Sequence, residues 1–233
     1  MYSVRLSWAA LFAGELKIPP LIGNALVFGA APDPVIPKDL LHSATIVTAN
    51  ASQLTLEACG VMKPHITFMR TNMSNGRDVD IMKLEALRDR KTGLLVLTPA
   101  EPSECENQLA LLARVNYRFD DLLITTPVER SILQNRVLGT GKRFLVNRYR
   151  PSMGLQAVMF CLGMGANSVA ISGISLRSDG CSFNALQYKR KHVDGDRVVL
   201  ARIRKRALPV YAVEEQFAVD AGLQRWPILA AAA

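Results

Sequence analysis

The sequence has few of the side chains and motifs that mark the commonest enzyme classes. It contains only three histidines and four cysteines in 233 residues. No cysteines form a CxxC pair, and no histidine stands at metal-ligand spacing from one, so we expect reduced thiols and no zinc site. The motifs GxGxxG, GxxxxGK[ST], GxSxG and HExxH are all absent. The usual dinucleotide, P-loop, hydrolase and zinc-protease signatures are therefore excluded.

The sequence also lacks a long apolar run. No stretch reaches the roughly 18 residues that a membrane-spanning helix needs. The first segment, "MYSVRLSWAALFAGELKIPP", has a short apolar core followed directly by Glu15 and shows no convincing cleavage site. We therefore interpret residues 3–17 as a peripheral first helix that lies on the protein body or on a membrane surface. Together these features predict a cytoplasmic protein, at most attached peripherally to the cytoplasmic side of the inner membrane.

Acidic residues are outnumbered by basic ones, giving a formal net charge of +8. Residues 187–206 hold much of this excess, with eight lysines and arginines against two aspartates. Such a segment indicates an anionic partner: nucleic acid, an anionic membrane surface or a phosphorylated substrate. Aromatic residues are only 6% of the chain, and Tyr188 alone lies among the basic residues. Because no stacking platform is present, we expect no nucleic acid, although a basic nucleic-acid-binding protein stays as an alternative.

Short β-rich runs alternate with helical segments along the whole chain. The expected strands are 25–30, 44–49, 65–70, 93–98, 121–126, 167–174 and 209–213, and the expected helices are 78–91, 103–115, 127–139, 151–163, 197–207 and 214–223. This alternation predicts a single α/β domain over 1–233, with a mostly parallel sheet flanked by helices. Ligands in such sheets bind beyond the carboxyl ends of the strands, which directs attention to the residues that follow each strand.

The stretch "RPSMGLQAVMF" (150–160) begins the most apolar of these helices. A helix N-terminus carries free N–H groups and a partial positive charge. Ser152 adds a hydroxyl, Gly154 permits close approach of a ligand, and Arg150 adds charge. The same residues also suit an ordinary capped core helix with Gly154 packed against the sheet, and the local pattern alone leaves both interpretations open.

His192 is the best candidate for a general base. It stands in the polar segment "KRKHVDGD" before a predicted helix, near Asp194 and Asp196. The unperturbed pKa of histidine lies near neutrality, which suits proton transfer. A solvated surface histidine is the alternative interpretation.

Several segments of the sequence occur in the same order as the motifs of a known family. "RPSMGLQAVMFCLGMGANSVAISGI" (150–174) resembles the small motif of sialyltransferases, a Pro-Ser-x-Gly helix followed by a strand that ends in glycine. It is also similar to the corresponding helix and strand of glycosyltransferase family 42, and family 29 shares the motif. "DGCSF" (179–183) resembles the loop that follows there, and His192 matches the position of the catalytic histidine. "ALVFGAAPDPVIPKDLLHSATIVTAN" (25–50) is similar to the large motif. The resemblance covers about 25–215.

The resemblance implies a Rossmann-like fold of the GT-A-variant type and a CMP-sugar donor. It implies inverting transfer of a sugar acid, of the sialic acid or Kdo type, to a glycan or lipid-linked oligosaccharide, with no metal or other cofactor. Such chemistry belongs to bacterial polysaccharide or lipopolysaccharide biosynthesis. His192 would be the base, and Arg177 would assist at the leaving phosphate. The residues expected to contact the sugar donor are Gly29, Ala31, Asn50, Arg150, Ser152, Gly154, Gly173, Ser182 and Phe183.

The sequence departs from the family pattern at two places. Ala30-Ala31-Pro32-Asp33 stands where the family has Asn-Gly-Pro-Ser, so an asparagine that contacts the donor in relatives is missing. Arg177 and Phe183 occupy positions where the bacterial enzymes place tyrosines on the leaving phosphate. A catalytically inactive relative is therefore an alternative. A pyrophosphokinase-like or nucleotidase relative is a third, for which we find no metal-binding carboxylate set.

Overall fold

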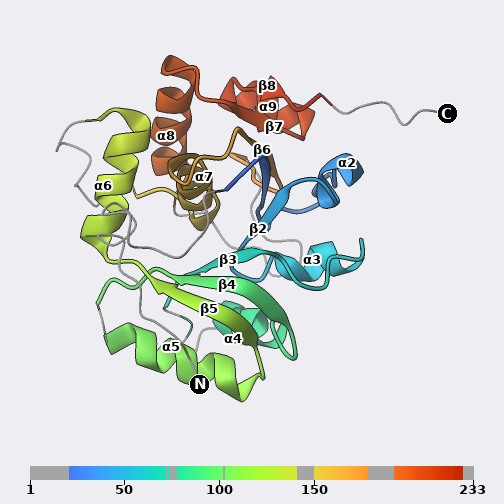
Figure 1. Cartoon of the computed structure of the whole chain (residues 1–233), viewed down its shortest axis with the longest axis vertical. Helices are drawn as coiled ribbons and strands as arrows, with labels where there is room; N and C mark the ends of the chain where they lie inside the picture. Colours follow the sequence, from blue (N-terminus) through green and yellow to red (C-terminus); the bar gives the residue numbers. More distant parts are fainter. Residues whose placement is uncertain are drawn as a thin grey trace.

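A computed structural model describes residues 21–71, 73, 78–101, 103–140, 150–177 and 192–227. Within them, eight strands form one sheet in the order β5-β4-β3-β2-β1-β6-β7-β8, and every neighbouring pair is parallel (Figure 1). The strands are β1 (Asn24–Phe28), β2 (Thr45–Ala49), β3 (Ile66–Met69), β4 (Lys91–Leu97), β5 (Arg118–Ile124), β6 (Ser168–Ser172), β7 (Val210–Ala212) and β8 (Gln224–Arg225). The prediction of an α/β fold with a mostly parallel sheet is confirmed.

Helices cover both faces of this sheet. They are α2 (Lys38–Leu41), α3 (Gln53–Glu57), α4 (Asp78–Glu85), α5 (Ser103–Arg114), α6 (Pro127–Leu138), α7 (Met153–Gly163), α8 (Val193–Lys205) and α9 (Glu215–Ala221). One core cluster packs α6, α7 and α8 on one face, while α2 and α3 lie on the other (Figure 1). Parallel strands covered on both faces read as continuous apolar runs, which explains why β1 and β6 were easy to predict.

Helix α7 is the central helix of the first cluster. It packs against β1, β2, β3, β6 and α6. Its residues from Met153 to Cys161 are all buried, and Phe160 meets Phe68 of β3 edge to face with ring centroids 5.0 Å apart. A helix that is apolar on all sides is stable only when other elements surround it. Its N-terminus is therefore fixed relative to the carboxyl ends of the central strands.

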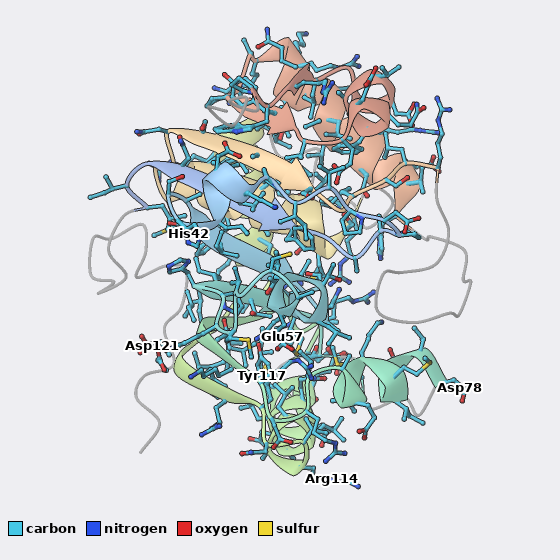
Figure 2. All side chains as sticks on the ribbon, turned by 90° about the vertical axis from the view of Figure 1, so that its right-hand side faces the viewer. His42, Glu57, Asp78, Arg114, Tyr117 and Asp121 are labelled. Carbon is cyan, nitrogen blue, oxygen red and sulfur yellow. The ribbon has the colours of Figure 1, made fainter. Side chains whose placement is uncertain are left out.

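Some predicted boundaries are wrong. Helix α8 begins at Val193 and not at 197, because acidic side chains in its first turn suit the positive end of the helix. Helix α4 ends at Glu85, and strand β4 already begins at Lys91. Strand β5 begins at Arg118, three residues early, because this strand lies at the edge of the sheet and tolerates polar residues. Figure 2 shows the Asp121 side chain pointing outward there.

The prediction for residues 3–17 lies outside the described residues. In the described part of the chain, no helix is both long and apolar enough to cross a membrane.

Candidate active site

The order of the strands creates a switch point between β1 and β6. From β1 the chain builds the sheet outward through β2 to β5, and then returns to β6 on the other side of β1. In doubly wound sheets, a crevice opens outside the carboxyl ends of the strands at such a point, and ligands bind there. The residues after β1 and after β6 are therefore the first candidates for a site.

The backbones after β1 and β6 approach each other closely. The Gly29 N–H donates to the Ser172 carbonyl (2.8 Å), and the Ala31 N–H donates to the Gly173 carbonyl (2.7 Å). A methyl group on Gly29 would lie 2.3 Å from the Gly173 carbonyl oxygen. Gly173 has a φ of +63°, in the left-handed region that favours glycine. Both glycines are thus required by the close approach of these two segments, beside which the crevice is expected.

Glu214, which follows β7 next to β6, joins the segments that follow β1 and β6. Its Oε1 accepts hydrogen bonds from the Gly173 N–H (2.8 Å), the Ser172 hydroxyl (3.0 Å) and the Val35 N–H (3.1 Å). Its Oε2 is buried and has no hydrogen-bond partner among the described residues. One carboxylate therefore orders the segments that follow β1 and β6. Sequence reasoning missed Glu214, because its partners lie 41 to 179 residues away and no local motif marks it.

The N-terminus of α7 lies beside the same crevice. Ser152 is the N-cap of this helix, and its hydroxyl accepts from the Leu155 N–H (3.4 Å). The buried carboxylate of Asp196, on α8, accepts from the Ser152 N–H (2.7 Å). Helix α7 accordingly begins at Met153, two residues after the predicted start. The Asp196 carboxylate already occupies one of the N–H groups at this helix end that could bind an anion. Asp196 was predicted only as a neighbour of His192.

Gly154 joins the helix to the end of β6. A methyl group there would lie 2.4 Å from Cδ1 of Ile174. The packing interpretation of Gly154 is thus supported by the geometry, and close approach of a ligand to its backbone stays a prediction. The same contact brings Ser152 and Gly154 next to the Gly29–Gly173 crevice.

The two glycines allow a matched stability test. Gly29→Ala sets a methyl group against a backbone carbonyl, which must shift at a cost of about 1–3 kcal/mol. Gly154→Ala sets it against the end of an isoleucine side chain, which can rotate, and alanine is the better helix former. We therefore expect Gly29→Ala to lower the free energy of unfolding by more than Gly154→Ala does in urea titrations. Equal losses from the two variants would contradict the close backbone approach.

His192 lies at the N-terminus of α8, next to Arg150. Its Nδ1 is 3.1 Å from the Arg150 carbonyl oxygen. Because that oxygen can only accept, the hydrogen bond assigns the proton of a neutral imidazole to Nδ1. The lone pair then lies on Nε2, the arrangement that a general base requires. The structure therefore brings His192 together with Arg150 and Ser152, across 40 to 42 residues of sequence.

Asn50 follows β2, one strand away from the crevice. It has a φ of +54°, its N–H donates to the Phe68 carbonyl (2.7 Å), and its side-chain oxygen accepts from the Arg70 N–H (3.4 Å). Asn50 thus shapes the backbone after β2 and β3. Nothing in these contacts tests its predicted role at the nucleotide.

The remaining predicted site residues are Arg177, Ser182 and Phe183. Arg177 is exposed and forms an ion pair with Asp220 of α9, so its charge is already partly balanced, and its role at the leaving phosphate stays a prediction. Ser182 and Phe183 lie outside the described residues. Within the described ranges, no three His, Cys, Asp or Glu side chains gather as metal ligands.

Comparisons with known proteins agree with this architecture. No protein-family model matches the chain, and no curated protein matches it. Among solved structures, the sialyltransferase CstII from Campylobacter jejuni with the substrate analogue CMP-3FNeuAc is 12% identical, with a TM-score of 0.56 over 89% of this chain and 87% of that one. CstII with a trisaccharide acceptor and CMP is 14% identical, with a TM-score of 0.58 over 88% and 87%.

A second Campylobacter jejuni enzyme gives the same result. The monofunctional α-2,3-sialyltransferase Cst-I is 11% identical, with a TM-score of 0.55 over 97% of this chain and 83% of that one. At these identities the likeness establishes the fold. The chain therefore has the fold of these Campylobacter jejuni sialyltransferases, as its motifs predicted.

Proposed function

We propose that the protein is a glycosyltransferase that moves a sugar acid, of the sialic acid or Kdo type, from a CMP-sugar donor to a glycan acceptor. The observation that carries this proposal is the meeting of three features at one edge of the sheet. They are the Gly29–Gly173 crevice, the N-terminus of α7 with Arg150 and Ser152, and the Nε2 of His192. Solved structures of this fold include complexes with CMP and with an acceptor trisaccharide.

The nucleotide would occupy the crevice between β1 and β6. The phosphate would face the N-terminus of α7 and the Arg150 guanidinium, two sources of positive potential. Because Asp196 already binds the Ser152 N–H, the Ser152 hydroxyl and Arg150 would supply more of the contact than that N–H does.

His192 would act as the general base of a single displacement. Its Nε2 takes the proton from the acceptor hydroxyl while that oxygen bonds to the anomeric carbon. The bond from the anomeric carbon to the phosphate oxygen breaks, and CMP leaves with the electron pair. One such displacement inverts the anomeric centre. The positive groups at α7 stabilise the charge on the leaving phosphate without a metal ion.

An anionic surface is a further proposed partner, which fits a glycan or lipid-linked oligosaccharide acceptor on the cytoplasmic side of a membrane. Helix α8 exposes Arg197, Arg202, Arg204 and Lys205. Arg206 is partly structural, because its guanidinium donates to the Val137 carbonyl (2.7 Å) at the end of α6. The basic segment thus combines a structural role with a charged outer face. Lys189, Arg190 and Lys191 lie outside the described residues.

A nucleotide panel tests the proposed sugar-donor class. At a free concentration of about 100 times Kd, CMP should add roughly 2.7 kcal/mol to the free energy of unfolding. For a chain of this length, that raises Tm by roughly 5–10 °C. CDP, UDP and GDP should give smaller shifts, and Mg²⁺ should not change their order. Stabilisation by UDP or GDP without any by CMP would contradict the proposal. Stabilisation by CMP without transfer from any CMP-sugar would identify an inactive relative.

A further inference from the structure

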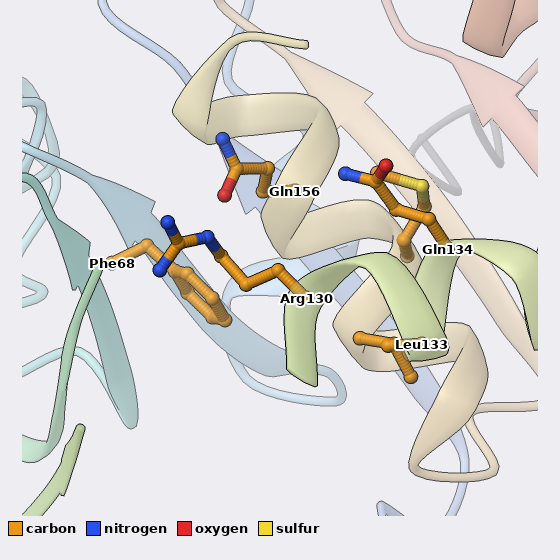
Figure 3. Close-up of a pocket in the computed structure, with 6 residues that line it drawn as sticks. Phe68, Arg130, Leu133, Gln134 and Gln156 are labelled. Carbon is orange, nitrogen blue, oxygen red and sulfur yellow. The ribbon is translucent and has the colours of Figure 1, made fainter. Parts of the chain in front are cut away.

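A partly open hollow lies between α6 and α7, next to the end of β3. Its empty volume is about 230 Å³, including space open to solvent, and the hollow as it stands has room for a group about the size of one water molecule. The lining residues are Phe68, Arg130, Leu133, Gln134, Gln156 and Met159 (Figure 3). The walls are thus largely apolar, with a guanidinium and two amides as the polar groups.

Arg130 is held by backbone carbonyls and not by a carboxylate. Its Nη2 donates to the Pro99 carbonyl (3.0 Å), and its Nη1 donates to the Thr125 carbonyl and, at 3.4 Å, to the Thr125 hydroxyl. A guanidinium has five N–H donors. Two of them, on Nε and Nη2, therefore have no hydrogen bond within the described part of the chain. Arg130 as a residue is only 8% exposed, and these contacts fix the position of its guanidinium.

Gln156 offers a second unused polar atom in the same hollow. Gln156 as a residue is 5% exposed, and its Oε1 is buried with no hydrogen-bond partner among the described residues. Its Nε2 donates to the Pro151 carbonyl (3.0 Å), which fixes the orientation of the amide. Figure 3 shows the Gln156 oxygen on the side facing Arg130. A buried acceptor without a donor is costly, so a ligand or water that donates to it is favoured.

Positive charge gathers around this hollow. Burial lowers the pKa of Arg130, and the charges of Arg150 and Arg70 lower it further, to about 10, against the opposing effect of Glu129 and Glu104. Burial alone would raise the pKa of Glu104, but hydrogen bonds from Thr71 and Ala100 and the charges of Arg70 and Arg150 hold it below its usual value. At Arg130, the repulsion from Arg150 and Arg70 therefore outweighs the attraction of Glu129 and Glu104, whereas Arg150 itself is stabilised by the charge of Glu104. A bound anion relieves that repulsion.

The hollow adjoins the proposed active site on the side away from the β1–β6 crevice. Gln156 is one turn along α7 from Ser152, and it hydrogen-bonds to the residue that follows Arg150. We propose that this hollow is an anion subsite for an acidic sugar of the acceptor. A carboxylate or phosphate of that sugar binds Arg130 at the open side, and a hydroxyl group donates to the buried Gln156 Oε1. Assigning the subsite to the acceptor rests on the proposed function, whereas anion binding itself does not.

Binding of matched probes to the full chain tests this subsite. Calorimetry measures the binding of 3′-sialyllactose, neutral lactose and inorganic phosphate, each with and without CMP. The comparison with lactose shows whether the acidic group is needed, and the comparison with phosphate shows whether the sugar is needed. We expect 3′-sialyllactose to bind at least about tenfold more tightly than either of the others. Arg130→Gln should remove this preference, and Arg114→Gln should leave it intact, because Arg114 lies at the outer end of α5 (Figure 2). CMP binding should be the same in all three proteins.

Arg70→Gln is a second variant, needed because Arg130→Gln also removes hydrogen bonds to two backbone carbonyls. It leaves those bonds intact and should weaken the preference for 3′-sialyllactose severalfold. Equal binding of sialyllactose and lactose would overturn the subsite, and so would a preference that survives both variants. Equal binding of phosphate would reduce it to a general anion site and overturn the acidic-sugar assignment. If the unchanged protein does not bind CMP but still prefers 3′-sialyllactose in an Arg130-dependent way, the proposed transferase function is contradicted and the anion subsite is supported.

Discussion

His192→Ala should abolish most glycosyl transfer while leaving CMP binding in place. A positioned general base contributes typically about 10²–10⁴-fold to the rate. The variant should therefore lower kcat by that factor, since no other histidine or carboxylate is predicted to take the acceptor proton. CMP should still raise Tm as it does in the unchanged protein, because His192 contacts the Arg150 carbonyl and not the crevice between β1 and β6. Release of CMP from CMP-sialic acid in the presence of an acceptor measures both effects.

His42→Ala is the matched control for this prediction. His42 is an exposed histidine at the end of α2, distant from α8 in the fold (Figure 2). Its removal should change neither kcat nor Tm measurably. Unchanged transfer by His192→Ala, or an equal loss in His42→Ala, would show that the base has been assigned to the wrong residue.

Glu214→Ala should have the largest effect on stability among the residues around the crevice. It removes one acceptor shared by two backbone N–H groups and the Ser172 hydroxyl. Only the N–H of buried Gly173 is left without an acceptor, because the Ser172 hydroxyl also donates to the Val35 carbonyl and Val35 is exposed to water. The loss should therefore be about 1.5–3 kcal/mol. Because the same bonds order the segments after β1 and β6, CMP should also bind more weakly. Urea unfolding gives the first quantity, and calorimetry with CMP gives the second.

The neighbouring glutamate separates this effect from a general loss of charge. Glu215 is 78% exposed in its side chain and pairs with Arg225 at 3.4 Å, so Glu215→Ala should cost less than about 1 kcal/mol. Glu214→Gln should fall between the two, because it keeps one accepting oxygen and places an amide N–H₂ where the buried Oε2 has no partner. If Glu214→Ala is as mild as Glu215→Ala, the carboxylate does not hold the crevice together.

The sheet was largely predictable because burial on both faces leaves a clear trace in the sequence. Strands β1 and β6 are short apolar runs, and each ends at a glycine that the crevice requires. The short elements α2, α3 and β8 were not predicted, since two to five residues are too few to show a period. The start of α8 was misplaced because Asp194-Gly195-Asp196 looks like a turn. In the fold, Asp196 is buried against the start of α7.

For the candidate site, the sequence suggests residues only where they form a local motif. Ser152, Gly154 and His192 stand in stretches that resemble a family motif, and the structure brings them together. Glu214, Arg130 and the Gln156 oxygen have no such signal. Glu214 and Arg130 act through contacts with the backbone of other elements, and the identity of a single glutamate or arginine does not tell which backbone it will meet. The Gln156 oxygen is notable only because it is buried without a partner, which no sequence pattern shows. Sequence patterns locate such residues only after the order of the strands is known.

The position of bound CMP tests the central claim most directly. In a crystal structure of the chain with CMP, we predict the nucleotide in the crevice beside Gly29, Ala31 and Gly173. Its phosphate should lie within hydrogen-bond reach, about 3 Å, of the Ser152 hydroxyl or the Arg150 guanidinium. CMP bound elsewhere, or an empty crevice at a CMP concentration that stabilises the protein, would contradict the account.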